Sequence, residues 1–364
     1  MKKENSGIER EKVLAQFYSS RFDSIQILRG IAALFVVAEH IRFLHCGAFG
    51  VDIFFCISGL IILFTTYTHT EHFLARRWVR IFPLYALMTM AVFTMTQIAS
   101  SAFAETQATE ISLIKSLCFI PFDVGAGVIQ PLVRVGWTLN CEMFFYLIFW
   151  ISFHISYRYR AWICSGFLVL IVSSGQLIMQ NGTVPSWLLA PLQLYGNPIM
   201  LEFVLGMIAC EIVRQCYLLV HLHPLKRPKI FAAVCLGGAI IVLCILATTS
   251  KVSVVSGLQR FFFWGILSAG VVILFLLAGL FLKFPRWMTR LGDISFSLYL
   301  LHYYPIQFFD RFVFDFSVLT VRSAVGAVIV VAGTLVLSYL TWLWIEKRLG
   351  RILNAWICRK KVWA

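Results

Sequence analysis

Apolar residues run along most of this chain in long stretches, with short polar or basic segments between them. Stretches such as Val51–Tyr67 and Trp137–Phe153 come close to the 18 or so apolar residues that cross about 30 Å of hydrocarbon as a helix. No stretch outside the apolar runs is long enough for a second globular domain. The pattern therefore predicts an all-α polytopic membrane protein with one membrane domain.

Ten transmembrane helices are expected. They lie near residues 25–42, 50–68, 82–100, 136–153, 162–179, 192–213, 230–248, 260–281, 292–310 and 323–345. The longest loop, Ser101–Val135, contains Pro121, Gly125 and Gly127, which favour turns over a continuous helix. Loops of this length are often lids or binding segments. We expect an N-terminal segment over 1–24, a transmembrane domain over 25–345 and a basic tail over 346–364.

The composition agrees with this architecture. The chain is 60% hydrophobic and 13% charged, with a mean hydropathy of +0.84, whereas a soluble domain carries about 25% charged residues. The polar N-terminal segment does not have the form of a cleavable leader, so we expect no signal peptide. Ten cysteines lie mainly in apolar stretches without a CxxC pair. They predict neither a metal site nor a disulfide framework, but small packing residues.

A net charge of +14 raises the question of nucleic acid. Most of the 31 Lys and Arg residues fall into the segments that lie inside if the N-terminus is cytoplasmic, and few fall outside. Basic residues concentrate on the cytoplasmic side of membrane proteins. The asymmetry therefore predicts an even number of spans with both termini in the cytoplasm, and it removes the need for a nucleic-acid partner.

Two polar residues share one face of the first predicted span. Arg29 and His40 are eleven residues apart, which is three helical turns plus about 20°. Arg29 can be an interfacial residue that snorkels and His40 a packing histidine, or the two can belong to a site. Charged side chains within the membrane cost about 3 kcal/mol each, so several of them on different spans favour a site.

Further ionisable residues occur on other predicted spans. Asp52 opens the second span, Glu142 lies early in the fourth and His302 lies midway along the ninth. With the predicted orientation, these three and His40 fall in the outer half or middle of the membrane. We expect them to line one polar cavity.

Three arginines form a compact cluster ahead of the third predicted span. Arg76 and Arg80 are four residues apart and Arg77 and Arg80 three, so a short helix presents all three on one face. Guanidinium groups suit phosphate oxygens. The cluster predicts an anion receptor at the cytoplasmic surface, with a topological anchor or a site for anionic lipid headgroups as the alternative.

Taken together, these residues and their surroundings resemble the acyltransferase 3 family of bacterial membrane O-acyltransferases, in order and spacing across nearly the whole chain. Two segments, Val135–Tyr146 and Leu194–Met207, are most similar to the exopolysaccharide and O-antigen acetyltransferase branch. The stretches that carry the resemblance are Arg29 with His40, Phe49–Gly59, Arg76–Tyr85, Trp137–Tyr146 and Ser295–His302.

The resemblance implies that Arg29 and His40 form the family's Arg-x10-His motif, with His40 as the leading catalytic candidate. It also implies that the arginine cluster serves the acyl-CoA end and that 25–345 is the acyltransferase domain. Further cavity candidates are Ser58, Trp137, Tyr146 and His302. Two features depart from the family pattern: Glu346 is not followed by a proline, and two tyrosines separate His302 from Pro305.

The mechanism expected from this resemblance uses acetyl-CoA as the acyl donor and no metal. His40 acts as general base on a hydroxyl of a cell-surface or lipid-linked glycan, Glu142 or Asp52 orients the imidazole, and Arg29 anchors the donor or stabilises developing negative charge. Direct transfer and an acetyl-histidine intermediate both remain open, as does succinyl in place of acetyl. The expected location is the bacterial inner membrane.

Two other classes of protein use similar residues. A transporter or flippase of a lipid-linked sugar or an anionic metabolite also places His, Asp, Glu and Arg within the membrane. A membrane scaffold uses such residues only to pack its helices. Acetyl transfer to glycan in vesicles separates an enzyme from a carrier, and substitution of His40 or Arg29 separates an enzyme from a scaffold.

Overall fold

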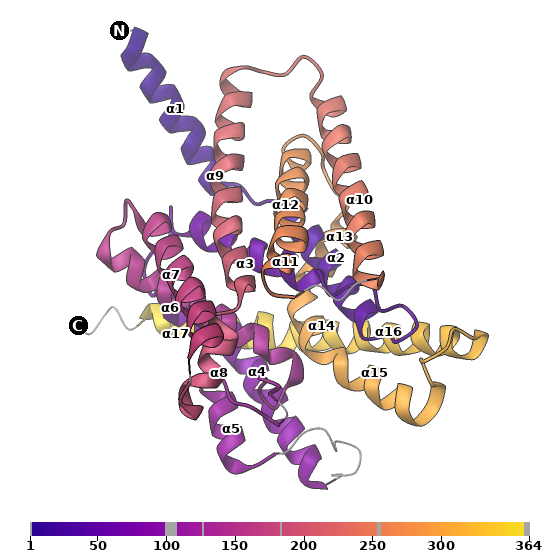
Figure 1. The fold of residues 1–364 in the computed structure, drawn as a ribbon. Coiled ribbons are helices and arrows are strands. Elements are labelled where there is room, and N and C mark those ends of the chain that lie inside the picture. The colour runs from indigo at the N-terminus through magenta and orange to yellow at the C-terminus, as the bar shows by residue number, and fades with distance from the viewer. Residues whose placement is uncertain (1, 99–107, 126, 183, 253–255, 360–364) are drawn as a thin grey trace. The chain divides into compact units, whose positions relative to one another are not determined.

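The computed structural model describes residues 2–98, 108–125, 127–182, 184–252 and 256–359, and these residues form helices joined by turns and loops (Figure 1). Their strand-like geometry is limited to one isolated bridge between Asp123 and Ile129. Within these described ranges, seven helices are long and apolar enough to cross a membrane. The predicted all-α, multi-pass membrane protein is therefore confirmed.

The seven membrane-length segments coincide with seven of the ten predicted spans. They are Phe73–Ile98, Arg134–Ile155, Arg160–Gln180, Pro198–Leu222, Pro228–Val252, Gly257–Gly279 and Val321–Ile357. The other three predicted spans fall on shorter helices. Helix α2 (Asp23–Glu39) has 17 residues and α3 (Gly50–Thr65) has 16, while the ninth span is divided between α14 (Ser295–Leu301) and α15 (Tyr303–Phe309). The count of ten stays a prediction.

The chain forms two compact units, each built from segments that are distant in sequence. The first unit contains Met1–Phe35, Cys46–Glu71 and Leu201–Asp293. The second contains Val36–His45, His72–Met200 and Ile294–Ala364. Helix α2 belongs to the first unit up to Phe35, and the residues that follow belong to the second.

Two closely packed helices form the centre of the first unit. A β-carbon at Gly59 of α3 would lie 2.1 Å from the Phe203 carbonyl oxygen, and one at Gly206 of α9 would lie 2.0 Å from the Cys56 carbonyl oxygen. Small residues let helix backbones approach in this way within a membrane. The helices of this unit are α1 (Lys2–Ser19), α2, α3, α9 (Leu201–Leu222), α10 (Pro228–Val252), α11 (Gly257–Arg260), the π-helical η3 (Phe261–Gly265), α12 (Ile266–Gly279) and α13 (Arg286–Asp293).

The second unit contains the arginine cluster and the helices that surround it. They are α4 (Phe73–Ile98), α5 (Glu110–Leu117), η1 (Arg134–Gly136), α6 (Trp137–Ile155), α7 (Arg160–Asn181), α8 (Ser186–Tyr195), η2 (Pro198–Met200), α14, α15, the π-helical η4 (Asp310–Phe314), α16 (Val321–Thr341), the π-helical η5 (Trp342–Leu349) and α17 (Gly350–Arg359). Figure 1 shows α16 as the long yellow helix near the C-terminus.

Several boundaries differ from the expected ones. The third span begins at Phe73, so the arginine cluster forms the first turns of α4, which continues through Pro83. The sixth span does not begin at 192, because the chain turns at Gly196–Asn197 and α9 starts at Leu201. The basic tail continues as helix to Arg359. Gly196 and Asn197, just before Pro198, are turn-forming residues, which explains why the sixth span begins later than expected.

The long external loop is partly helical. Thr109 caps α5 through a reciprocal pair of hydrogen bonds with Ser112, 2.9 and 3.1 Å long. After α5 the chain turns, with positive φ at Gly125 and Gly127, as their sequence predicts. Residues 101–107 of the predicted loop lie outside the described residues.

Candidate active site

Two histidines meet in the second unit. His40 lies directly after the last residue of α2 and is half-buried, while His302 is fully buried between α14 and α15. His302 Nε2 is 3.2 Å from His40 Nδ1, and the ring centroids are 4.9 Å apart. The structure thus brings together two of the predicted site residues, although they come from spans far apart in sequence.

The hydrogen bonds of this pair define which nitrogen is available for chemistry. His40 Nδ1 lies 2.9 Å from the Val36 carbonyl oxygen and His302 Nδ1 lies 3.1 Å from the Leu298 carbonyl oxygen. A carbonyl only accepts, so each Nδ1 carries the hydrogen and donates it. The one Nδ1 hydrogen of His40 is then shared between two acceptors, the Val36 carbonyl oxygen and His302 Nε2. This tautomer leaves the lone pair of His40 on Nε2, the arrangement that a general base requires.

An aromatic residue and an arginine complete the surroundings of His40. The Tyr303 ring meets His40 edge-on at 5.2 Å, and Arg134 Nη1 donates to the Tyr303 hydroxyl at 2.8 Å. Sequence reasoning did not single out either residue. In the sequence, these two residues are marked only by their position next to candidate residues: Tyr303 follows His302, and Arg134 lies just before the segment that begins at Trp137.

Hydrogen bonds join the N-terminal end of α6 to α14 close to the histidines. Tyr299 donates to the Val135 carbonyl oxygen at 3.0 Å, and its hydroxyl is 2.8 Å from the Thr138 hydroxyl. Trp137, a predicted cavity residue, is the first residue of α6. These buried bonds hold α14, and therefore His302 at its end, in a defined place.

The arginine cluster lines a cavity of about 660 Å³ in the second unit. Arg76, Arg77 and Arg80 contribute from the first turns of α4, so the predicted shared face exists. The opposite wall comes from η5 and α17. The lining residues are Arg76, Arg77, Val79, Arg80, Trp342, Glu346, Lys347, Gly350 and Asn354.

The wall formed by η5 was not foreseen. Lys347 Nζ lies 5.0 Å from the centre of the Trp342 ring, and Glu346 accepts a hydrogen bond from Ser297 of α14. A π-helical stretch changes which side chains share a face, and such stretches are frequent at functional sites. The sequence assigned Lys347 and Asn354 only to a basic tail.

Glu142 lies on the side of the arginines. Tyr146 of α6 donates a hydrogen bond to Glu142, and the Arg77 guanidinium is 5.9 Å from the centre of the Tyr146 ring. The structure therefore groups Glu142 and Tyr146 with the predicted donor end.

The remaining candidates belong to the first unit. Arg29 on α2 donates to Gln26 at 3.4 Å, and Ser58 lies on α3. Asp52, fully buried on α3, accepts two hydrogen bonds from Arg260, at 3.0 Å from Nε and 2.7 Å from Nη2.

A further buried carboxyl group lies in the same unit. Glu202 of α9 is fully buried, and a β-carbon at Gly265 would lie 3.2 Å from its Oε1. Glu202 falls within the Leu194–Met207 segment, but sequence reasoning did not single it out. The arrangement makes Gly265 of η3 a residue whose small size accommodates Glu202.

Removing the guanidinium of Arg260 is expected to destabilise the first unit. Arg260→Ala leaves the buried Asp52 carboxylate without its bidentate partner, which costs about 3–5 kcal/mol for a buried pair. We expect a lower melting temperature in detergent, largely restored when Asp52→Asn is added. Arg322→Ala is the control, because that arginine is exposed and donates to the backbone carbonyl of Val313 rather than to a carboxylate. Equal melting temperatures for the Arg260 and Arg322 variants would contradict the pair's importance.

Membrane-length helices define a multi-pass membrane protein, and its second unit carries an imidazole pair and an arginine-lined cavity. The chain belongs to the acyltransferase 3 family: the family model described as an acyltransferase domain matches residues 22–343. It is accordingly a membrane O-acyltransferase, and the family expected from its motifs is confirmed.

Three characterised proteins are similar to this chain. The exopolysaccharide production protein ExoZ of Rhizobium meliloti is 30% identical over 72% of this chain and 77% of its own length. The peptidoglycan O-acetyltransferase OatA of Listeria monocytogenes is 26% identical over 90% of this chain and 56% of its own length. The acyltransferase MdmB of Streptomyces mycarofaciens is 25% identical over 80% of each chain. No solved structure matches.

Proposed function

We propose that this enzyme transfers an acetyl group from cytoplasmic acetyl-CoA to a hydroxyl of a cell-surface or lipid-linked glycan. The observation that carries the proposal is the arginine-lined cavity in the same unit as the His40–His302 pair. The names of two relatives refer to exopolysaccharide production and to O-acetylation of peptidoglycan, which supports a glycan acceptor.

The donor end is assigned to the arginine cavity by its chemistry. Three guanidiniums and the Lys347 ammonium line about 660 Å³, within the roughly 300–1,000 Å³ typical of small-molecule sites. Guanidinium groups bind phosphate oxygens through paired hydrogen bonds, and an ammonium adds a point charge. The phosphates of coenzyme A fit this donor set, with the acetyl thioester directed toward His40.

The transfer itself is assigned to His40. Its Nε2 takes the proton of the acceptor hydroxyl while the oxygen attacks the thioester carbonyl carbon. The carbon–sulfur bond then breaks, and the proton passes to the leaving thiolate, so the products are an acetyl ester and free coenzyme A. His302 holds the His40 tautomer. The positive charge of Arg134, next to Tyr303, stabilises negative charge that develops on the carbonyl oxygen.

The proposed membrane placement has ten spans, both termini in the cytoplasm and the bacterial inner membrane as location. Arg76, Arg77 and Arg80 then face the cytoplasm at the start of α4. The loop after α4 and the loop between α7 and α8 face outward. Residues 109–124, which follow α4, and residues 186–190 of α8 border one cavity in the second unit, which supports placing these segments on the same side.

Acetyl transfer in membrane vesicles tests the function directly. With acetyl-CoA carrying a radioactive acetyl group, we expect alkali-labile label in the glycan of vesicles that contain the protein and none in vesicles that lack it. A carrier would move its substrate without forming an ester. Label that accumulates as free acetate or intact acetyl-CoA, with none in glycan, would refute the proposal.

Substitution in the arginine cluster should act on the donor. We expect Arg77→Ala or Arg80→Ala to raise the KM for acetyl-CoA by roughly 10- to 100-fold, because each removes charge-assisted hydrogen bonds worth about 1.5–3 kcal/mol. Lysine should restore only part of the loss, since it lacks the guanidinium fork.

Steady-state kinetics with varied acetyl-CoA and with varied acceptor measure the two KM values. Arg158→Ala is the matched control, because Arg158 is an exposed basic residue predicted on the same side but outside the cavity. Full activity of the lysine variants would instead favour a topological anchor.

A further inference from the structure

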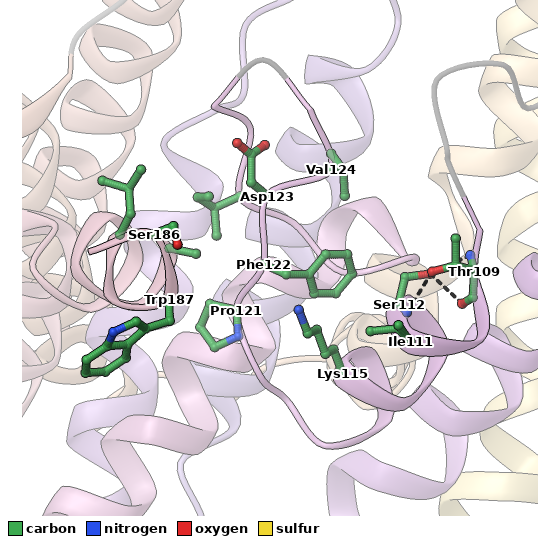
Figure 2. Close-up of a pocket in the computed structure, with 13 residues that line it drawn as sticks. Thr109, Ile111, Ser112, Lys115, Pro121, Phe122, Asp123, Val124, Ser186 and Trp187 are labelled. Carbon is green, nitrogen blue, oxygen red and sulfur yellow. Dashed lines mark hydrogen bonds between the residues drawn. The ribbon is translucent and has the colours of Figure 1, made fainter. Parts of the chain in front are cut away.

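A second cavity lies in the second unit, away from the arginines. It has a volume of about 430 Å³ and is bordered by α5, by residues 121–124 with Ile129 and by the start of α8. Figure 2 shows Ser186 and Trp187 on one side and Thr109 and Ser112 on the other, with Lys115 and Phe122 between them. Nothing in the transfer chemistry described above uses this cavity.

Local hydrogen bonds give the cavity walls a defined shape. The reciprocal cap between Thr109 and Ser112 starts α5. Asp123 accepts hydrogen bonds from the backbone N–H groups of Gly125 and Gly127, at 2.7 and 3.2 Å, which closes the turn after Phe122. A wall whose turns are already bonded loses little conformational entropy on binding a ligand.

The lining combines an aromatic face with polar groups of several kinds. Trp187 borders the cavity and is 75% exposed, so its indole is not packed into the core of the unit. Lys115 is held with its ammonium 5.8 Å from the centre of the buried Phe122 ring. The Ser186 hydroxyl is exposed, and the Asp123 carboxylate keeps lone pairs beyond its two backbone bonds.

This combination fits a sugar residue better than it fits lipid or an anion. A sugar ring has an apolar C–H face for an indole and hydroxyls that both donate and accept hydrogen bonds. Lys115 and Asp123 offer one donor group and one acceptor group. A site for a lipid headgroup would be dominated by basic residues. A site for an acyl chain would have an apolar lining without charged side chains, whereas this lining contains Lys115 and Asp123.

We propose that this cavity binds a sugar residue of the acceptor glycan, with Trp187 as the stacking surface and Lys115 and Asp123 as hydrogen-bonding groups. The inference rests on the proposed function and adds to it a place where the acceptor is held.

The position of the cavity supports an acceptor role. Helix α4 has 26 residues, about 39 Å at 1.5 Å per residue. The arginine cluster occupies its first turns, while Gln97 near its end donates to the Ala108 carbonyl, the residue before Thr109 of the cavity wall. Donor cavity and sugar cavity therefore lie along opposite halves of one helix. If the glycan is bound through a sugar distant from the reacting hydroxyl, the local concentration of that hydroxyl at the base is raised.

The test compares acceptor and donor kinetics in the full-length protein. Trp187→Ala and Lys115→Met are expected to raise the KM for glycan about tenfold each, as loss of roughly 1.4 kcal/mol of binding energy does, and to leave the KM for acetyl-CoA unchanged. Trp187→Phe should retain most of the affinity. Trp162→Ala is the matched control, because Trp162 is 80% exposed in the same unit but lies outside the cavity.

A binding measurement separates failure of this inference from failure of the proposed function. Oligosaccharide fragments of the host's surface glycan are titrated into purified protein without acetyl-CoA, and tryptophan fluorescence is followed. Saturable quenching that Trp187→Ala removes and Trp162→Ala leaves supports the site. If wild-type protein transfers acetyl groups but Trp187→Ala changes neither quenching nor the glycan KM, the sugar site is overturned while the function stands. Equal losses in both tryptophan variants would show a membrane-interface anchor instead and would also overturn it.

Discussion

Replacement of His40 by alanine or by glutamine is expected to lower acetyl transfer by about 10²- to 10⁴-fold, while the protein still accumulates in the membrane. A positioned general base contributes that range of rate enhancement. Glutamine tests the chemistry more sharply than alanine, because it preserves a polar group of similar reach but cannot take a proton at neutral pH. The initial rate of ester formation at saturating acetyl-CoA is the measurement.

The neighbouring histidines supply the controls for His40. His45 lies in the same segment and is exposed, with its ring bonded to Glu39, so His45→Ala should leave the rate unchanged. His302 acts through His40 as a positioning residue. We expect His302→Gln to lower kcat less than His40→Gln does, to shift the pH–rate profile and to leave the KM for acetyl-CoA unchanged. Substantial transfer by His40→Gln would remove His40 from the base role.

The sequence predicted the site residues that depend on helical periodicity more readily than those that depend on tertiary packing. The i, i+4 spacing of Arg76 and Arg80 is a property of a single helix, and the structure places both on the same cavity. His40 and His302 each stood out as an intramembrane imidazole, but no periodicity tells how two helices pack. Their 3.2 Å contact required the structure.

Other parts of the site were missed because local backbone geometry departs from the regular helix. Lys347 and Asn354 were assigned to a tail, whereas the π-helical η5 and the helix after it carry both to the arginine cavity. Likewise, the pairing of Glu142 with Tyr146 is an i, i+4 contact on α6 that spacing could have revealed. The role of Glu142 in orienting His40 stays a prediction.

The division of the chain was also beyond sequence reasoning. Hydropathy marks spans along the chain but does not show which spans group together, because lipid-facing and protein-facing apolar residues look alike. In the first unit, for example, α3 packs against α9, and this close contact depends on Gly59 and Gly206. Glycine at these positions becomes informative only when the partner backbone is known.

Donor and acceptor are expected to enter from opposite faces of the membrane. The arginine cluster lies at the start of α4, and the loop that follows α4 borders the proposed sugar cavity, so one membrane-length helix separates the two. Coenzyme A is highly charged and does not cross a bilayer unaided. In sealed vesicles of defined orientation, acetyl-CoA should therefore support transfer only when it is added on the side that bears Arg80, and should give none from the other side.

Cys118 provides an independent marker of the outer face, because it is an exposed free cysteine directly after α5 in the predicted external loop. An impermeant thiol reagent added to right-side-out vesicles should label the protein, and Cys118→Ser should reduce that label while leaving transfer activity intact. In inverted vesicles the same reagent should reach Cys118 only after the membrane is permeabilised. If acetyl-CoA works equally well from both faces, or if Cys118 is labelled only from the side that bears Arg80, the two-sided arrangement is wrong. The arginine cavity and the sugar cavity would then have to open to the same compartment, and their donor and acceptor roles would need to be reassigned.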